Sequence, residues 1–211
     1  MSHTMCHPVP EMSSRPARAR RDAARTRREA ARERILGAAE RLLRDRPYRE
    51  LSVEEVMEEA GLSRTTFYRH FDGLPEVVLS LFDTITQGLM AEVVGAPGSG
   101  ATRRILEAAV DAYAEHGGLL RAVDEAARHD ADIETAYRAV VDGFTTVIAG
   151  QIEEGMAAGR IRPGNAHELA RALNLMNGNY LLETLGRDPG FDRTLAVDTL
   201  MAVWGPVASA E

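Results

Sequence analysis

The sequence contains no lysine, and all 25 of its basic residues are arginine. Without lysine the chain cannot form a Schiff base with a carbonyl substrate, and it cannot complete a Walker-type phosphate loop. The glycine-rich segment GAPGSG, Gly95–Gly100, is therefore predicted to be a flexible linker between helices. Cysteine is nearly absent as well. With Cys6 alone no internal disulfide is possible, which is usual in a reducing compartment.

Other signatures of catalysis and of membrane insertion are also missing. There is no nucleophile elbow and no clustered spacing of metal ligands. Cys6 lies near His3 and His7, but in an N-terminal tail without the fixed geometry that a metal site needs. No continuous apolar run approaches the length of a membrane span, and the N-terminus is arginine-rich rather than apolar. We therefore expect a cytoplasmic protein that is not an enzyme and uses no metal or cofactor.

The residues that are present favour helices. Aromatic residues make up only 5% of the chain, alanine and leucine abound, and no segment alternates β-branched with polar residues. This composition predicts an all-α protein of about nine helices. Apolar periodicity, glycine and proline place them over residues 25–45, 53–60, 64–71, 75–94, 102–116, 118–129, 132–158, 166–185 and 192–207.

Charge is distributed unevenly along the chain, whose net charge is −7. Between Arg15 and Arg34 nine arginines stand against three acidic residues, whereas from Gly95 onward acidic residues outnumber arginines. A basic end on an acidic body is expected of a protein that docks nucleic acid with one end only. Residues 1–24 are predicted to form a disordered basic arm. Such an arm either enters a minor groove or acts as a solvated tail with unspecific attraction.

The stretch after this basic end reads as a helix, a tight turn and a second short helix. Ser52 and Glu55 form an S-x-x-E capping box, which places the start of a helix just after Ser52. Gly61 supplies the left-handed residue at the end of this helix, and Ser63 can cap the next one. Phe67 and Phe71, at i and i+4, would pack the second helix against the core. This arrangement predicts a helix-turn-helix, although a helical hairpin in any all-α core shares the pattern.

The face left exposed on the second helix carries hydroxyls, guanidiniums, a phenol and an imidazole, with no carboxylate. These groups suit phosphates and the major-groove edges of bases. The whole stretch, LSVEEVMEEAGLSRTTFYRHFDGLPEVVLSLF, resembles the DNA-binding signature of the TetR family of transcriptional regulators. The resemblance implies that Arg64 and Thr65 face bases and that the hydroxyls, Tyr68 and His70 touch phosphates or groove walls. The candidate DNA-binding residues are Ser52, Ser63, Arg64, Thr65, Thr66, Tyr68, Arg69 and His70. One position departs from the family, because Leu74 stands where a phosphate-gripping lysine is usual.

The C-terminal part is predicted to bind a ligand and to dimerise. Its last two helices are apolar on more than one side, so each needs two partners, the domain core and a second subunit. AHELARALNLMNGNYLLETL resembles the EthR-like subgroup of TetR repressors, in which the matching N-L-M-N residues line a hydrophobic ligand channel. An ordinary core, with both amides turned to helix ends or to the dimer seam, is the alternative. The candidate ligand-binding residues are Tyr113, Phe144, Asn174, Asn177, Tyr180 and Trp204.

Together these features divide the chain into a basic arm over residues 1–24, a helix-turn-helix domain over 25–73 and a ligand-binding and dimerisation domain over 74–211. The predicted function is that of a TetR-type regulator, a repressor released from a palindromic operator in double-stranded DNA by a small hydrophobic effector. The alternatives are a ligand-independent architectural DNA-binding protein and, less favoured, an all-α enzyme.

Overall fold

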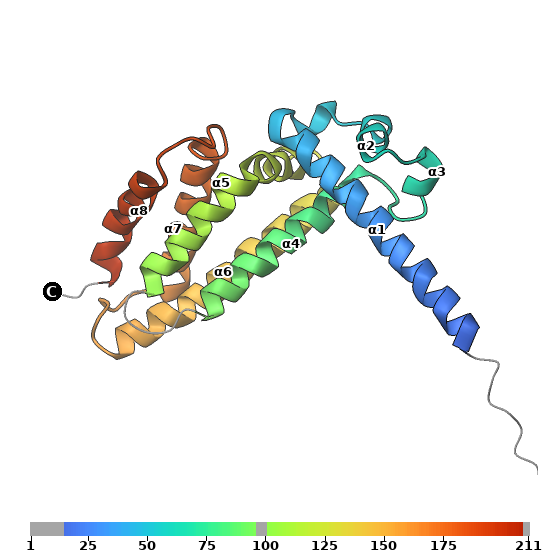
Figure 1. Ribbon diagram of the computed structural model, residues 1–211. Helices are drawn as coiled ribbons and strands as arrows, with labels where there is room; N and C mark the ends of the chain where they lie inside the picture. The colour runs from blue at the N-terminus through green and yellow to red at the C-terminus, as the bar shows by residue number, and fades with distance from the viewer. Residues whose placement is uncertain (1–14, 96–100, 209–211) are drawn as a thin grey trace, which may run out of the picture.

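The computed structural model describes residues 15–95 and 101–208, and within these ranges the only regular secondary structure is helical (Figure 1). The predicted all-α fold is confirmed. The helices are α1 Arg15–Asp45, the 3₁₀ helix η1 Tyr48–Glu50, α2 Val53–Ala60, α3 Arg64–Phe67, α4 Leu74–Gly95, α5 Ala101–Ala127, α6 Ala131–Ala157, α7 Ala166–Glu183 and α8 Arg193–Ala208.

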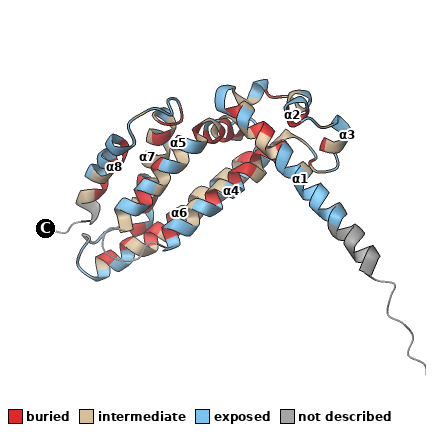
Figure 2. Ribbon diagram, in the orientation of Figure 1, coloured by how far each residue is buried: buried red, intermediate tan, exposed pale blue. Residues whose placement is uncertain are grey.

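The helices form two packed groups joined by α4 and α5. The helices α1, α2 and α3 gather at one end, while α4 and α6 run side by side away from them, and α5, α7 and α8 cover the other end (Figure 1). The N-terminal half of α1 projects beyond this body into solvent and is exposed along its described surface (Figure 2).

The first helix begins earlier than the sequence predicted. Residues 15–24 were expected to belong to a disordered arm, but α1 already starts at Arg15. Alanine and arginine both have high helix propensity, so the helix can extend N-terminally past its buried part without tertiary contacts. Residues 1–14, with His3, Cys6 and His7, lie outside the described residues. Of the predicted linker over 95–100, Gly95 is the last residue of α4, and residues 96–100 lie outside the described residues.

Two predicted helices, 102–116 and 118–129, are one bent helix, α5. His116 alone inside it has non-helical dihedral angles, with φ −117° and ψ 15°. The bend follows from close packing of two glycines, since a Cβ on Gly118 would lie 2.6 Å from the Cα of Arg44 in α1. A Cβ on Gly117 would lie 2.8 Å from the Cα of Gly186 after α7. The backbone of α5 therefore touches both neighbouring chain segments directly.

The hydrophobic core consists of two clusters that meet along α4 and α5. The first joins α1, α2 and α3 to the start of α4 and the second half of α5, and it includes Ile35, Phe67 and Val123, each fully buried. The second joins the end of α4 and the first half of α5 to α6, α7 and α8. Tyr113 packs against both clusters. The N-terminal domain and the C-terminal domain thus share one continuous apolar interior.

Helix α4 corrects the expectation that no segment resembles a membrane span. In the described part of the chain it is the one helix long and apolar enough to cross a membrane by length and composition. Its apolar surface is instead used by protein, because α4 packs against α1, α5 and α6 and buries Val78 and Phe82. A helix with apolar residues on two sides is expected where two core clusters meet.

Candidate DNA-binding surface and ligand cavity

The helix-turn-helix is built from local signals that act as predicted. The backbone N–H of Glu55 donates to Ser52 Oγ at 3.3 Å, and the Ser52 N–H donates to Glu55 Oε2 at 3.1 Å, which closes the capping box. The Ser52 hydroxyl and the Arg46 guanidinium hydrogen-bond to Glu55 and hold the pKa of its carboxyl below the usual value. Gly61 ends α2 with φ 62°, a left-handed conformation that favours glycine. Ser52 is thus engaged in the cap rather than placed on the surface of α3.

The second helix is shorter than expected. Ser63 caps it by accepting a hydrogen bond from the backbone N–H of Thr66, but α3 ends at Phe67, and turns continue to His70. Phe67 and Phe71 are both buried and their rings pack 5.8 Å apart, as the i, i+4 spacing predicted. Two buried aromatic rings therefore hold a one-turn helix and the turn that follows it against the core.

Five of the eight predicted DNA-binding residues are exposed: Ser63, Arg64, Thr65, Tyr68 and Arg69. Arg64 is not free in this structure. Its guanidinium forms an ion pair with Glu54 of α2, donates to Tyr68 Oη at 3.3 Å and lies 5.7 Å from the centre of the Tyr68 ring. The Tyr68 hydroxyl and Glu54 raise the pKa of Arg64 further. The side chain predicted to read a base is thereby preoriented at the exposed end of α3.

His70 lies at the edge of the same surface, half-buried. Partial burial lowers its pKa below the ordinary value of 6.5, and Arg28, Arg32 and Arg69 lower it further because they are positively charged. The imidazole is therefore held neutral within a basic environment. Phosphates are the groups that such an environment attracts.

Sequence reasoning missed the part that the arginines of α1 play in supporting this motif. Arg34 donates to the carbonyl oxygen of Ala60, at the C-terminal end of α2, at 2.6 Å. Arg28 donates to the carbonyl of Arg69 at 3.3 Å, and Arg32 donates to Ser80 Oγ at 2.9 Å. Cations at a helix C-terminus are stabilising. The arginines of α1 are visible in the sequence, but the sequence does not specify which carbonyl or hydroxyl each side chain reaches.

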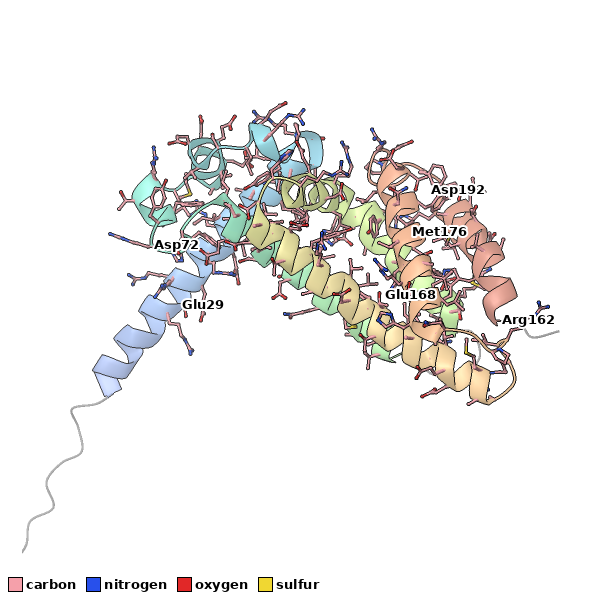
Figure 3. The ribbon with its side chains drawn as sticks, turned by 180° about the vertical axis from the view of Figure 1, so that it is seen from behind. Glu29, Asp72, Arg162, Glu168, Met176 and Asp192 are labelled. Atoms are coloured by element: carbon pink, nitrogen blue, oxygen red, sulfur yellow. The ribbon has the colours of Figure 1, made fainter. Side chains whose placement is uncertain are left out.

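Leu74, in the position where a lysine is usual, is the first residue of α4 and is partly buried against the first cluster. It contributes to the core instead of to phosphate binding. Nearby, the N–H of Asp72 donates to Glu76 Oε2 at 2.7 Å, which ties the loop before α4 to its first turn. Figure 3 labels Asp72 in this loop and Glu29 on the projecting part of α1.

A cavity of about 390 Å³ lies between α4, α5, α6 and α7, with Trp204 of α8 also in its wall. Its wall comes from both core clusters: Phe82, Leu120 and Tyr137 belong to or pack on the first, and Ile105 and Leu181 belong to the second. The cavity therefore extends from the DNA-proximal end of the domain into its C-terminal core. This volume falls in the range of about 300–1,000 Å³ that is typical of ligand pockets.

Five of the six predicted ligand-binding residues line this cavity: Tyr113, Phe144, Asn174, Asn177 and Trp204. Tyr180 does not. It follows the helical row of Leu169 and Met176, which packs against the second cluster on another side of α7. The i, i+3 spacing of Asn174 and Asn177 correctly predicted that both line one cavity. Tyr180 lies on a different side of α7 and does not face it.

Hydrogen bonds fix the orientation of both amides. The indole N–H of Trp204 can only donate, and it lies 3.2 Å from Asn177 Oδ1, so the Nδ2 group of Asn177 keeps its donors for other partners. The Thr145 hydroxyl donates to the carbonyl of Val141 at 2.8 Å and accepts from Asn174 Nδ2 at 3.2 Å. Asn174 Oδ1 therefore remains an acceptor. The cavity offers one amide donor and one amide acceptor in a mostly apolar wall.

Comparisons with known proteins agree with this geometry. A family model described as bacterial regulatory proteins, tetR family, matches residues 35–78. A second, described as the C-terminal domain of the transcriptional regulator EthR, matches residues 102–207. The first range contains the helix-turn-helix, and the second contains most of the residues that line the cavity.

Whole-chain relatives point the same way. The HTH-type transcriptional regulator EthR of Mycobacterium tuberculosis is 31% identical over 173 residues, which cover 77% of this chain and 79% of that protein. A protein described as a TetR-family transcriptional regulator from Rhodococcus sp. superposes with a TM-score of 0.72 at 20% identity, over 85% of this chain and 100% of its own. NalD, the secondary repressor of the MexAB-OprM multidrug efflux pump in Pseudomonas aeruginosa, superposes with a TM-score of 0.67 at 19% identity, over 86% and 97%. The two solved structures share the fold of this chain.

Proposed function

Because the chain belongs to the TetR family of DNA-binding transcriptional regulators and carries an EthR-type C-terminal domain, we propose that it is a homodimeric repressor released from an inverted-repeat operator by a small, largely apolar ligand. Its role is regulation of transcription and not catalysis. Regulators of this family bind operator DNA, form dimers and respond to small-molecule effectors. As a protein that works on the chromosome, it acts in the cytoplasm.

The observation that carries the proposal is the course of α4. Its first turns bury Val77 and Val78 in the cluster that contains the helix-turn-helix, and its later turns place Phe82, Ile85 and Leu89 in the cavity wall. A ligand that displaces the later turns of α4 therefore also shifts the residues of α4 in the cluster against which α3 packs. Ligand and operator need to favour different conformers for release, with a coupling of about 1–3 kcal/mol.

On the DNA side, two copies of α3 related by a two-fold axis read an inverted repeat whose half-sites lie about one helical turn or a little more apart. Arg64 and Thr65 face bases, while Ser63, Thr66, Tyr68, Arg69 and His70 contact the sugar-phosphate backbone. The exposed N-terminal half of α1 extends the basic surface beyond the helix-turn-helix and adds phosphate contacts.

The dimer forms through α7 and α8. Support comes from large apolar side chains left exposed on them: Leu175 is 52% exposed, Leu195 53% and Val203 43%. Leu182, which is also on α7, is unsuited to a test of this interface because it lines the cavity and packs on the first cluster. Leu195 and Val203 are therefore the better positions for a test of the interface.

The ligand occupies the cavity and is elongated, mostly apolar and equipped with a hydrogen-bond acceptor for the Nδ2 group of Asn177. An elongated shape follows from a cavity whose wall draws on both core clusters. The acceptor follows from the Trp204 indole, which uses Asn177 Oδ1 and leaves the amide donors available.

A thermal-shift screen of apolar amides, ketones and esters, followed by operator binding for each hit, tests the proposal. A ligand at about 100 times its dissociation constant should stabilise the fold by about 2.7 kcal/mol and should reduce operator affinity. Phe144→Trp, which fills part of the cavity, should weaken both effects while the apo protein still binds the operator. If hits stabilise the protein but no hit alters operator affinity, the protein is a ligand-independent DNA binder.

A further inference from the structure

The cavity contains one ionisable carboxylate, and it lies at the DNA-proximal end. Among the described residues that line the cavity, Asp124 of α5 is the one with a charged side chain. It stands with Phe82, Leu120 and Tyr137, which belong to or pack on the first core cluster. The Asp124 side chain is 31% exposed, so its carboxylate borders both the cavity and solvent.

Asp124 is only half-paired within the protein. Its Oδ2 accepts a hydrogen bond from Arg128 at 2.6 Å, an i, i+4 pair on α5 whose arginine side chain is 69% exposed. Within residues 15–95 and 101–208 no donor reaches its Oδ1. A carboxylate has two oxygens that both accept hydrogen bonds, so Asp124 can hold Arg128 through Oδ2 and keep Oδ1 for a second cation.

Aromatic rings surround the same end of the cavity. The rings of Phe82 and Tyr137 stack 5.9 Å apart, and Phe144 and Tyr113 continue the aromatic wall along the cavity. Burial raises the pKa of Tyr113 and of Tyr137, and the nearby charge of Asp124 raises both further, so these phenols stay neutral. A cation over neutral aromatic faces is attracted by the ring quadrupole, most strongly where water is excluded.

The hydroxyl of Tyr113 offers a ligand one further polar contact. Tyr113 lies deep in the domain, yet part of its surface stays accessible because it borders the cavity. Its hydroxyl lies near α7, where a Cβ on Gly178 would be 3.6 Å away, and it makes no hydrogen bond with the described residues. A ligand in the cavity is in a position to hydrogen-bond to this hydroxyl.

We propose that the effector is a cationic amphiphile, with an ammonium group seated between Asp124 and the rings of Phe82 and Tyr137 and an apolar body extending along the cavity towards Trp204. This inference rests on the proposed ligand-controlled function and adds the charge of the ligand to it. The cation lies beside Phe82, the point at which α4 leaves the first cluster, so it occupies the end of the cavity nearest the helix-turn-helix. The acidic composition of the chain from Gly95 onward favours the entry of a cation over that of an anion.

The test compares two probes of one shape in the full-length dimer. 4-Butoxyphenyltrimethylammonium carries the cation, and 1-butoxy-4-tert-butylbenzene replaces its nitrogen by carbon. Isothermal titration should give the ammonium compound an affinity at least about tenfold higher. Equal affinities would overturn the cationic assignment while leaving an apolar effector possible. Failure of both probes to bind the cavity would overturn the cationic assignment, and failure of the wider screen to find any hit that releases the operator would overturn the proposed function instead.

Three variants locate the cation. Asp124→Asn should abolish the preference for the ammonium compound and leave the affinity for its carbon isostere unchanged. Arg128→Gln, which removes the positive charge beside the same carboxylate and with it the repulsion of a second cation, should increase the preference. Glu125→Gln is the matched control, because Glu125 pairs with Arg49 at 2.6 Å and does not line the cavity, so the preference should stay as in the wild type. If Asp124→Asn weakens both probes equally, or Arg128→Gln has no effect, the ammonium group does not sit at Asp124.

Discussion

At the scale of single residues, Arg64, the side chain proposed to read a base, is held in place at the exposed end of α3 before DNA arrives. Arg64 pairs with Glu54 and rests on the Tyr68 ring, so fewer rotamers are lost when the guanidinium meets a base. The same pairing has a cost, because the guanidinium has to exchange the carboxylate of Glu54 for the edge of a guanine. If Arg64 reads a base as proposed, Glu54 influences which base it selects as well as how strongly it binds.

Replacing Arg64 by alanine should reduce affinity for the best operator by roughly tenfold to a hundredfold and relax selectivity at one base pair in each half-site. Tyr68→Phe should weaken binding to all sequences alike, because a phosphate contact carries no base information. Binding to a panel of operators with single base changes measures both effects. A uniform loss across the panel for Arg64→Ala would assign that side chain to the phosphates.

Asn177 is expected to serve the fold and the ligand at once. Asn177→Leu leaves the Trp204 indole N–H without its acceptor, so the apo protein should lose about 1–3 kcal/mol of stability. Ligand-induced stabilisation should fall in addition, while apo operator binding should barely change. Urea denaturation with and without ligand separates the two losses. Ligand stabilisation equal to that of the wild type would show that the amide is purely structural.

His70 should make operator binding depend on pH. Because its pKa is lowered in the folded protein, the unfolded chain binds more protons just below pH 6.5, and the stability contributed by His70 is lost as pH falls through that range. A phosphate beside the imidazole raises its pKa again, so binding takes up a proton and operator affinity should rise as the pH is lowered. His70→Gln should flatten this dependence in binding measured between about pH 7.5 and 6. An unchanged slope would place His70 away from the phosphates.

At the scale of whole elements, local chemistry was readable from the sequence and tertiary contacts were not. The capping box of Ser52 with Glu55 and the left-handed Gly61 depend on neighbours in the chain, and both were predicted correctly. The bend at His116 was expected to be a break between helices, because the sequence cannot show that Gly118 packs on the backbone of α1. The asparagine pair was predicted to line one cavity, because its i, i+3 spacing is local. Asp124 was not predicted there, because it reaches the cavity only through the packing of α5 on α4 and α6.

The contact between α5 and α1 gives a prediction of its own. Gly118→Ala forces a methyl group to within 2.6 Å of the Cα of Arg44, and backbone cannot move aside as a side chain can, so it should destabilise the protein by about 1–3 kcal/mol. The substitution should also change the affinity for the operator, because α2 and α3 of the helix-turn-helix pack in the same cluster as α1. Gly88→Ala is the control. Its Cβ meets nothing within 4 Å, and helix propensity should stabilise it by up to about 1 kcal/mol. Equal stability of the two variants would show that the α1–α5 contact yields easily.

At the scale of the whole molecule, the proposed control of DNA binding requires the two cores and the two subunits to act together. His116 Nδ1 lies 2.8 Å from Glu40 Oε1, and Arg49 pairs with Glu125, so polar contacts as well as apolar ones connect α1 and η1 to α5. Movement in the cavity wall can therefore reach α3 through α4 and through the bend of α5. The spacing between the two copies of α3 depends in turn on the dimer interface.

Leu195→Arg should convert the dimer to a folded monomer, because it places a charge in the apolar surface of α8. Operator affinity should fall strongly, since one half-site then has to hold a monomer alone. Val94→Arg is the matched control: Val94 is 65% exposed at the far end of α4, and its replacement should leave the dimer intact. Sedimentation velocity distinguishes the two, and a Leu195→Arg variant that stays dimeric would move the interface away from α8.

Trp204, which hydrogen-bonds to Asn177 and lines the cavity, is the single tryptophan of the chain. Any emission excited at the red edge of protein absorption therefore comes from one indole at the wall of the binding site. Its spectrum should respond to the polarity of whatever fills the cavity and to the strength of the hydrogen bond from its N–H. Since DNA contributes almost no fluorescence, occupancy of the cavity can be followed on the operator-bound protein itself. The order in which ligand enters and operator leaves is then open to stopped-flow measurement without a label.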